Sequence, residues 1–322
     1  MKREEQLAIV RALLEQPTAP FHEEAVRDEI VKQLRCCPHV RTEFDPFGNL
    51  IARYRHKTRS AAKWAFAAHM DHPGWVRTKR KGFHFLGSVA ERYLKKPKLR
   101  EYGAFAMWDL PAFETRNGLL YSRACDDLLG CAEIICLFRH LEELDAEVHC
   151  VGIFTRAEEV GFVGAIQFAR SQILPKQTIV FSLETSAPRG GVEIGRGPIV
   201  RVGDRVSVFD SAGTLHLLSL ANDEDIPVQR ALLDGGTCEG TAYQLYGYRS
   251  VAASIALGNY HNCAPDGSIG CEYVSTDDYI NMIRLCVATA CSKADVGEAA
   301  RSLRGKLEKK AALLKPFYRT LR

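Results

Sequence analysis

The chain has 322 residues, of which 46% are hydrophobic and 25% charged, values ordinary for a globular protein of one large domain or two. Its net charge of +4 is small and dispersed, which argues against a nucleic acid partner. No apolar run approaches the length that spans a bilayer, and the amphipathic pattern after residues 1–6 does not resemble a signal peptide, so we expect no membrane association.

The N-terminal part of the chain predicts two helices, a hairpin and a buried strand. Apolar residues at helical spacing mark a first helix that ends before Pro17 and a second over residues 23–34. Two short strands flank a turn-forming segment within residues 40–54. The apolar run Trp64–His69 suits a strand that is buried on both faces.

Strands and helices alternate after residue 126. We expect helices at 127–141 and 163–169 and strands at 148–154, 179–183 and 250–257. This alternation predicts an α/β fold in which a mixed sheet is flanked by helices on both faces.

Residues 74–121 interrupt the alternation with turn signals, such as Asn117-Gly118, and with no helical pattern. A structureless loop of this length is uncommon in a compact domain. We therefore predict a small β-rich domain, inserted into a larger α/β domain that comprises residues 1–73 and 122–322.

The last 25 residues, 298–322, are helical in pattern and strongly basic. A solvated helix face is the simpler interpretation, and a contact with another subunit or an acidic partner is the alternative.

The chain contains eleven cysteines, an odd number, and none forms a C-x-x-C pair with zinc-finger spacing. Several stand within apolar helical patterns, where small buried residues are common. We therefore expect reduced thiols, which are typical of a cytoplasmic protein.

Histidines and carboxylates stand at or just beyond the ends of the predicted strands. His69 ends an apolar strand, and Asp71 follows on the same face, where its carboxylate can orient the imidazole. Glu184 and His261 follow later strands in the same way. A single histidine or acid at such a place is usually a satisfied polar residue. Several of them together indicate a site, because open α/β sheets form their sites at the carboxyl ends of strands.

Two pairs of neighbouring acids complete the set. Asp126 and Asp127 precede a predicted helix, where an N-cap and a first-turn acid are the simpler explanation. A carboxylate can also bridge two cations, and Asp126 is the candidate for that role. Glu158 and Glu159 follow a buried strand, where one can bind a metal and the other can take a proton from water. Together these groups predict two divalent cations in a hydrolytic enzyme.

The order of these residues resembles that of the M42 family of dinuclear zinc aminopeptidases, which includes glutamyl, deblocking and tetrahedral aminopeptidases. The matching stretches cover nearly the whole catalytic portion: Phe47-Gly48-Asn49-Leu50, His69-Met70-Asp71, Asp126-Asp127, Glu158-Glu159-Val160-Gly161, Gly195-Arg196-Gly197-Pro198, Gly235-Gly236-Thr237 and Tyr260-His261.

The resemblance implies a role for each group. One metal would be held by His69, Asp126 and Glu184, a second by Asp126, Glu159 and His261, and Glu158 would be the general base. We count Asp71, which can orient the imidazole of His69, as the second catalytic residue beside Glu158. The metals would be zinc, although this ligand set also suits cobalt and manganese. The inserted domain would shape substrate access and help subunits to associate, so we expect a homo-oligomer.

Gly235, Gly236 and Thr237 precede a predicted helix, so their backbone amides could hold a substrate carbonyl or carboxylate. Four positions depart from the family pattern: His72, where an acid is usual; Leu128, where a basic residue is common; Cys238, where an aspartate is expected; and Glu184, where aspartate is more usual. None of these departures removes a ligand.

We therefore expect a metal-dependent aminopeptidase that hydrolyses N-terminal residues from peptides through a water activated by two metals. The nearer alternative is a dinuclear-metal deacylase or a carboxypeptidase-type amidohydrolase. The more distant one is a non-catalytic scaffold, which would be expected to lack some ligands. A serine hydrolase is poorly supported, because the chain has no G-x-S-x-G motif.

Overall fold

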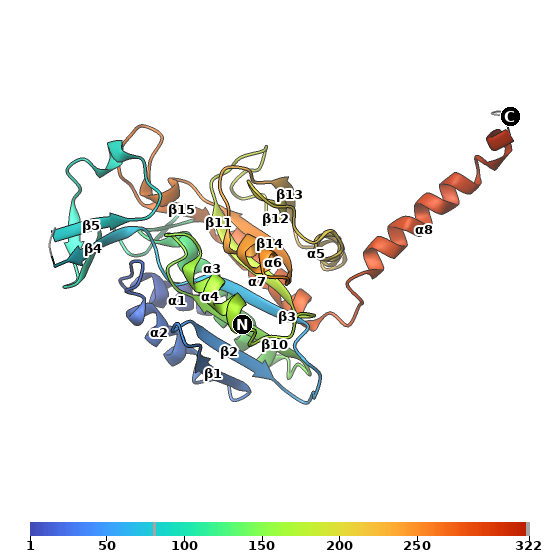
Figure 1. Ribbon diagram of the computed structural model, residues 1–322, viewed down its shortest axis with the longest axis horizontal. Coiled ribbons are helices and arrows are strands. Elements are labelled where there is room, and N and C mark those ends of the chain that lie inside the picture. Colours follow the sequence, from blue (N-terminus) through green and yellow to red (C-terminus); the bar gives the residue numbers. More distant parts are fainter. Residues whose placement is uncertain (80–81, 320–322) are drawn as a thin grey trace.

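A mixed eight-stranded sheet forms the centre of the molecule, as the computed structural model shows for residues 1–79 and 82–319 (Figure 1). The spatial order of its strands is β1 (Val40–Phe44), β2 (Leu50–Arg55), β10 (His149–Thr155), β3 (Trp64–His69), β11 (Ile179–Ser186), β14 (Arg249–Ala256), β12 (Ile199–Gly203) and β13 (Gln229–Leu232). The four strands from β10 to β14 are mutually parallel, whereas β2 and β12 run antiparallel to the neighbours that they pair with on either side of this group.

Helices cover both faces of this sheet. One face carries α1 (Arg3–Leu14), α2 (Glu24–Leu34), α3 (Cys125–Glu143), α5 (Ser211–Asp223) and α7 (Thr276–Cys291), and the other carries α4 (Val163–Ser171) and α6 (Glu239–Leu245). Side chains alternate along β3 accordingly. Trp64, Phe66 and Ala68 belong to the larger core, and Ala65 and Ala67 to the core under α4 and α6. The predicted α/β fold is confirmed.

Helix α3 is enclosed between the sheet and the outer helices α1, α2 and α7. Every residue from Cys125 to Phe138 is buried, which explains why apolar residues occur on all sides of this helix after Asp127, with Glu133 as the exception. Gly152 of β10 permits the close approach, because a Cβ at this position would lie 2.7 Å from Cγ2 of Ile134. The middle of α3 is thereby packed closely against β10.

The segment after β3 forms two small sheets. Strands β5 (Gly82–Leu86), β4 (Gly74–Thr78), β7 (Phe105–Trp108) and β6 (Leu99–Glu101) make a four-stranded sheet, and a 3-10 helix, η1 (Glu91–Leu94), lies between β5 and β6. Its core includes Trp75 and Trp108, whose ring centroids are 4.4 Å apart. Strand β8 (Glu114–Arg116) instead pairs with β9 (Leu119–Ser122), and β9 pairs on its other side with β15 (Glu272–Ser275), which ties this segment to the C-terminal third of the chain.

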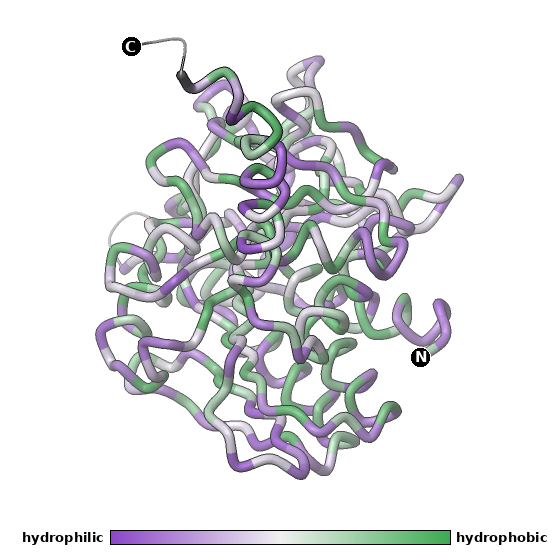
Figure 2. Tube along the Cα trace, turned by 90° about the vertical axis from the view of Figure 1, so that its right-hand side faces the viewer, coloured by the Kyte–Doolittle hydropathy of each residue, from purple (hydrophilic) through white to green (hydrophobic). Residues whose placement is uncertain are grey.

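The C-terminal helix α8 (Glu298–Ala312) projects away from the body, and a 3-10 helix, η3 (Lys315–Arg319), follows it (Figure 1). None of the residues of α8 is buried. Figure 2 shows hydrophilic and hydrophobic residues following one another along this segment. The helix predicted over residues 298–322 is shorter than expected, because α8 ends at Ala312. Residues 320–322 of that prediction lie outside the described residues. Within the described ranges, no helix has the length and apolarity needed to cross a membrane.

The predicted elements of residues 23–69 agree with the structure to within a residue. The strand predicted at 179–183 continues to Ser186, so Glu184 lies inside β11 rather than at its end. Strands β12 and β13 and helices α5 and α7 were not predicted individually.

Candidate active site

A cavity of about 410 Å³ lies at the carboxyl ends of the parallel strands. His69 is the last residue of β3, and Glu184 lies near the end of β11. The cavity lining includes every predicted site residue except Asp71: His69, Asp126, Glu158, Glu159, Glu184, Gly235, Gly236, Thr237 and His261.

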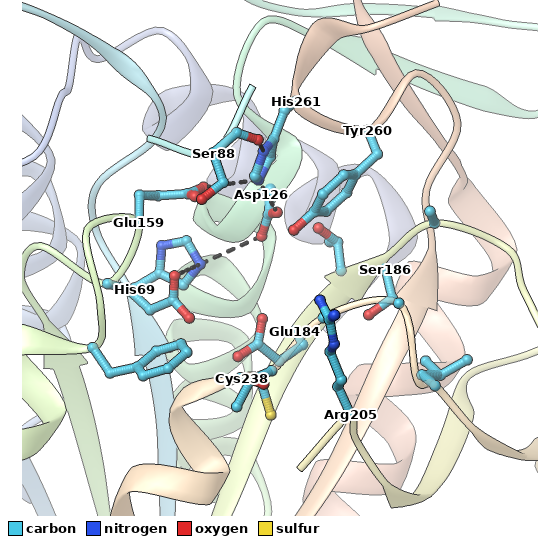
Figure 3. Close-up of a pocket in the computed structure, with 18 of the residues that line it drawn as sticks. His69, Ser88, Asp126, Glu159, Glu184, Ser186, Arg205, Cys238, Tyr260 and His261 are labelled. Atoms are coloured by element: carbon cyan, nitrogen blue, oxygen red, sulfur yellow. Dashed lines mark hydrogen bonds and ion pairs between the residues drawn. The ribbon is translucent and has the colours of Figure 1, made fainter. Parts of the chain in front are cut away.

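Asp126 lies between the two histidines, and each of its carboxylate oxygens faces a different one (Figure 3). Oδ1 is 3.4 Å from Nε2 of His69, and Oδ2 is 3.4 Å from Nε2 of His261. Nε2 of His261 also lies 3.2 Å from Oε1 of Glu159. A carboxylate that is shared between two imidazoles in this way has the arrangement that a ligand bridging two cations requires.

The backbone at Asp126 and Asp127 departs from the helix that follows. Asp126 has φ −82° and ψ 109°, Asp127 has φ −119° and ψ 36°, and the peptide bond between them is cis. Asp127 turns away from the cavity, and its Oδ1 accepts the N–H of Gly130 at 3.3 Å. A Cβ at Gly130 would lie 2.5 Å from Oδ2 of Asp127, so glycine is required there. The first-turn acid is therefore Asp127, and Asp126 is free to face the site.

Both histidines direct Nε2 into the cavity. Nδ1–H of His69 donates to the backbone carbonyl of Asp71 at 3.0 Å, and Nδ1–H of His261 donates to that of Ser88 at 3.1 Å. This hydrogen bonding leaves Nε2 of each ring unprotonated in the neutral form, which is the state that binds a metal.

These residues fit the binding of divalent metal. His69, Asp126 and Glu159 each offer one atom within a group that spans no more than 4.8 Å. Ligand atoms about 2.1 Å from a tetrahedral ion are separated by about 3.4 Å, close to the contacts between Asp126 and the histidines. Oδ1 of Asp126, Oε1 of Glu159 and Nε2 of His261 are buried without a hydrogen-bond partner among the described residues. Buried polar atoms of this kind are rarely left unpaired, and bound metal would supply their partners.

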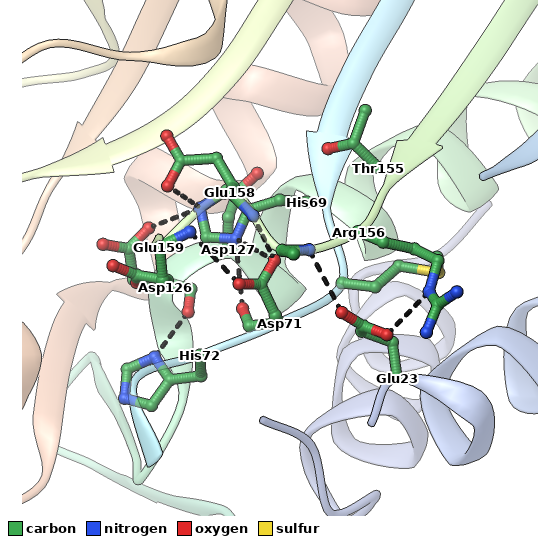
Figure 4. A network of polar contacts seen from close by, with 12 residues as sticks. Glu23, His69, Asp71, His72, Asp126, Asp127, Thr155, Arg156, Glu158 and Glu159 are labelled. Atoms are coloured by element: carbon green, nitrogen blue, oxygen red, sulfur yellow. Dashed lines mark hydrogen bonds and ion pairs between the residues drawn. The ribbon is translucent and has the colours of Figure 1, made fainter. Parts of the chain in front are cut away.

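Glu158 and Glu159 are held in place through their backbone (Figure 4). The buried carboxylate of Asp71 accepts the N–H of Glu158 at 2.9 Å and that of Glu159 at 3.1 Å. Oδ1 of Asp71 lies 3.6 Å from Nδ1 of His69, whereas the backbone carbonyl oxygen of Asp71 lies only 3.0 Å from the same nitrogen. Asp71 therefore contacts the glutamate pair through its carboxylate and the imidazole chiefly through its carbonyl, a division that the sequence analysis did not foresee.

Glu184 lies on the side of the cavity that is nearer to Cys238 and Arg205 (Figure 3). Its Oε1 accepts a long hydrogen bond of 3.4 Å from Oγ of Ser182. Glu184 is not part of the compact group of three formed by His69, Asp126 and Glu159. Its carboxylate therefore faces the cavity with little to hold it.

The carboxylates of this site are close enough to raise one another's pKa by electrostatic repulsion. Burial raises the pKa of Glu184 to about 8 and that of Glu158 well above its usual range; His69 offsets this in part at both residues, and Arg201 also does so at Glu184. Although burial alone would raise the pKa of Asp126, the two imidazoles hold it below its usual range. Burial lowers the pKa of His69, but Glu158 and Asp126 outweigh this effect and raise it. More negative charge converges here than two histidines can balance, which further favours bound cations.

The sequence of the M42 glutamyl aminopeptidase family matches residues 95–285 of this chain. The chain belongs to the M42 family. A protein of Acetivibrio thermocellus named "Putative aminopeptidase" is 25% identical over 323 residues, which cover 84% of this chain and 94% of the relative.

Solved structures share the fold. An aminopeptidase of Desulfurococcus kamchatkensis has a TM-score of 0.76 and 21% identity, covering 94% of this chain and 98% of that one. The TET1 peptidase of Pyrococcus horikoshii has a TM-score of 0.74 and 21% identity, covering 90% and 99%. As an M42 protein, this chain is a metal-dependent aminopeptidase.

A buried glutamate that the sequence analysis missed supports the M42 site. Glu272 of β15 accepts the N–H groups of Cys125 and Asp126 on Oε2, at 2.7 and 3.1 Å, and that of His261 on Oε1, at 2.8 Å. It therefore joins the backbones that carry two of the predicted ligands. No local pattern marks this residue, because its partners come from distant parts of the chain.

The departures from the M42 pattern are also buried. Nδ1 of His72 contacts the backbone carbonyl of Asp126 at 2.6 Å, and its Nε2 lies 3.1 Å from Oδ1 of Asn262. Leu128 belongs to the larger core, and Cys238 lines the cavity. Tyr260, of the 3-10 helix η2 (Tyr260–Asn262), and three arginines also line the cavity and were not predicted.

Proposed function

We propose that this M42 chain is a dinuclear metallo-aminopeptidase that removes N-terminal residues from peptides. His69, Asp126 and Glu184 would hold one cation, and Asp126, Glu159 and His261 the other. The observation that carries this proposal is the position of Asp126, whose oxygens lie 3.4 Å from two different imidazoles. Zinc is the cation we favour, because two histidines and carboxylates suit it, although cobalt and manganese accept the same ligands.

Glu158 would act as the general base. When bound, two divalent cations supply Lewis acidity toward the scissile carbonyl and acidify a water molecule. Glu158 lines the cavity, its pKa is raised by burial, and its backbone is tethered by Asp71. Its carboxylate would accept the proton of the attacking water and then deliver it to the leaving amine. Asp71 would contribute by keeping Glu158 and Glu159 on the correct sides of the cavity.

Gly235, Gly236 and Thr237 would contact the substrate, because all three line the cavity. A Cβ at Gly236 would have no neighbour within 4 Å, so an extended peptide could approach the backbone there closely. This role rests on the position of the segment beside the predicted ligands.

We also propose that the segment 74–121 is a separate insertion that shapes substrate access and association between subunits. The related TET1 peptidase of Pyrococcus horikoshii assembles into a tetrahedron or a large octahedral shell, which supports a homo-oligomer here. A cytoplasmic location is supported by the cysteines, all eleven of which are free thiols.

The decisive experiment measures amino-acid release from unblocked peptides by purified protein, with a chelator and with zinc, cobalt or manganese added back. We expect metal-dependent release from the N-terminus and none from N-acetylated copies of the same peptides. Release of acyl groups from N-acylated amino acids, with unblocked peptides left intact, would instead support the deacylase alternative. Bound metal measured by elemental analysis at one ion or fewer per chain would contradict the dinuclear site.

A further inference from the structure

We propose that the C-terminal helix α8 belongs to an exchange arm, which docks into an apolar groove on the body of a second copy of this chain. The arm comprises residues 298–319, and the groove is bordered by α1, the C-terminal ends of α3 and α5, and one face of α7. The match to the M42 family ends at residue 285, so the arm lies outside it. The inference is independent of the proposed metal site.

The arm has an apolar stripe that its own chain does not cover. Leu303, Leu307 and Leu314 are four and seven residues apart, so they lie on one side of the helix and of the turn that follows it. Their exposed fractions are 46%, 59% and 51%, and no residue of α8 is buried. A lone helix of this length is only marginally stable in water, and Gly305 weakens it further. The arm therefore gains stability as a helix only when another surface covers the stripe.

The body of the same chain does not provide this surface. Helix α8 leaves the body beside α5, which it contacts, and then projects away from it (Figure 1). The surface that covers the length of the stripe therefore belongs to another molecule.

The groove is a hollow of about 490 Å³ on the face of the sheet that carries α1, α3, α5 and α7. Much of its apolar lining comes from one side of α7, where Ile280, Val287 and Ala288 are seven and eight residues apart from the first to the others. Leu144, which follows α3, also lines the groove and is exposed. An amphipathic helix typically binds its protein partner by placing its apolar side in a groove of this kind.

Charge favours the body of a second copy over a second arm as the partner. Residues 298–322 contain eight basic residues and two acidic ones, a net charge of +6, so the rest of the chain carries −2 of the total of +4. Lys310 lies on the same side of α8 as the stripe, three residues after Leu307. Two arms that packed stripe to stripe would bring like charges together and bury Lys310 in the contact.

The rim of the groove carries the opposite charge. Glu224 lines it within a run of three exposed acids, residues 223–225, none of which forms an ion pair among the described residues. Two arginines also line the groove. Arg3 is paired with Asp277 at 2.6 Å, and Arg284 donates to the backbone carbonyl of Glu224. The three acids therefore outweigh the one arginine without a carboxylate partner, and the rim attracts a basic arm.

The root of the arm and the groove lie next to each other, which makes the exchange reciprocal. Glu224 is the C-cap residue of α5, the helix beside which α8 leaves the body. Cys291, the last residue of α7, lines the groove, and α8 begins at Glu298. One two-fold axis between two copies can therefore place each arm in the groove of the other, so that the contact forms twice.

Photo-cross-linking of the full-length protein tests the partner directly. p-Benzoylphenylalanine takes the place of Leu307, ¹⁵N-labelled and unlabelled copies are mixed, and the linked peptides are identified by mass spectrometry. We expect links between copies, from the arm to residues 140–144 or 280–291. Links within one copy, links from arm to arm, or no links between copies would each overturn the proposal.

Substitutions in the groove test the same contact from the other side. Leu144→Ser removes apolar contact and Glu224→Lys reverses the charge of the rim, so each should lower the yield of these links by about 5-fold or more. Leu245→Ser is the matched control, because Leu245 is an exposed leucine of α6 on the opposite face of the sheet. Equal yields in Leu144→Ser, Glu224→Lys and this control would contradict the assignment of the groove.

Sedimentation velocity measures how much the arm contributes to self-association. Leu303→Ser/Leu307→Ser should raise the concentration of half-association by about 10-fold or more. Leu313→Ser is the control within the arm, since Leu313 is exposed and lies about 100° around the helix from Leu314. It should change this concentration by less than about 2-fold, and equal effects of both variants would argue against the stripe.

A lipid surface is the other partner that a basic amphipathic arm can have. Vesicles of phosphatidylcholine with about 30% phosphatidylserine provide the probe. Binding of the wild-type protein to these vesicles that is lost in Leu303→Ser/Leu307→Ser, without links between copies, would assign the arm to anionic lipid and overturn the exchange.

Discussion

Replacing Glu272 with glutamine should weaken both the fold and the metal site. The carboxylate of Glu272 accepts three backbone N–H groups, those of Cys125, Asp126 and His261, at 2.7 to 3.1 Å. A glutamine has one oxygen and one NH2 group, so in either orientation at least one of these N–H groups faces another donor. Leaving one buried N–H unsatisfied costs about 1–3 kcal/mol, and we therefore expect the free energy of unfolding to fall by about 2 kcal/mol.

The metal site should weaken at the same time, because Asp126 and His261 lose a common support. Removal of such supporting contacts typically lowers metal affinity by about 10- to 100-fold. Urea unfolding of the metal-free protein measures the first effect, and competition with a chromophoric zinc chelator measures the second. Glu114→Gln is the matched control, because Glu114 belongs to the same three-stranded sheet and is exposed. A Glu272→Gln protein that matches this control in both measurements would refute the reasoning.

Three further predictions follow from the structure. Glu158→Gln should lower kcat by about 100- to 10,000-fold with unchanged zinc content, measured by kinetics and elemental analysis; activity close to wild type would contradict its role as the base. Zinc at 100 times its Kd should raise the free energy of unfolding by about 2.7 kcal/mol for each site that it fills, whereas an unchanged urea midpoint would argue against a site formed by the folded chain. Both oxygens of Glu133 are buried and lack hydrogen-bond partners among the described residues, and burial raises its pKa well above the usual 4.5. The folded protein therefore keeps a proton that the unfolded chain releases, so stability should fall as the pH rises from about 4.5 toward the raised pKa. Urea unfolding between pH 5 and 8 should show a shallower fall for Glu133→Gln, and identical pH slopes would contradict this assignment.

Local patterns were enough for much of the fold. The apolar run from Trp64 to His69 is β3 with the predicted bounds, because a strand between two helical layers must be apolar on both faces. The repeated apolar spacing of residues 23–34 likewise predicts α2, which begins at Glu24. The strand that holds Glu184 was predicted too short, because the polar residues that end the apolar run still pair with β14.

The sequence by itself also determined which residue types were available for the site and their order along the chain. Its matching stretches identified the M42 resemblance, which the family comparison confirms. Charge and spacing singled out His69, Asp126 and His261, but not the distances between them.

Only the tertiary structure decided how these groups meet. The order β10-β3-β11-β14 brings the ends of strands from distant parts of the chain to one edge of the sheet, and Asp126 then lies between two histidines. The surroundings of Glu272 and Arg201 could be recognised only from the tertiary structure. Glu272 is a polar residue in a short strand, and Arg201 is a charged residue in an apolar strand. The spacing of apolar residues along the sequence indicates which face of its own helix or strand a residue lies on. The partners of a buried charge are chosen by long-range strand pairing, which no local pattern encodes.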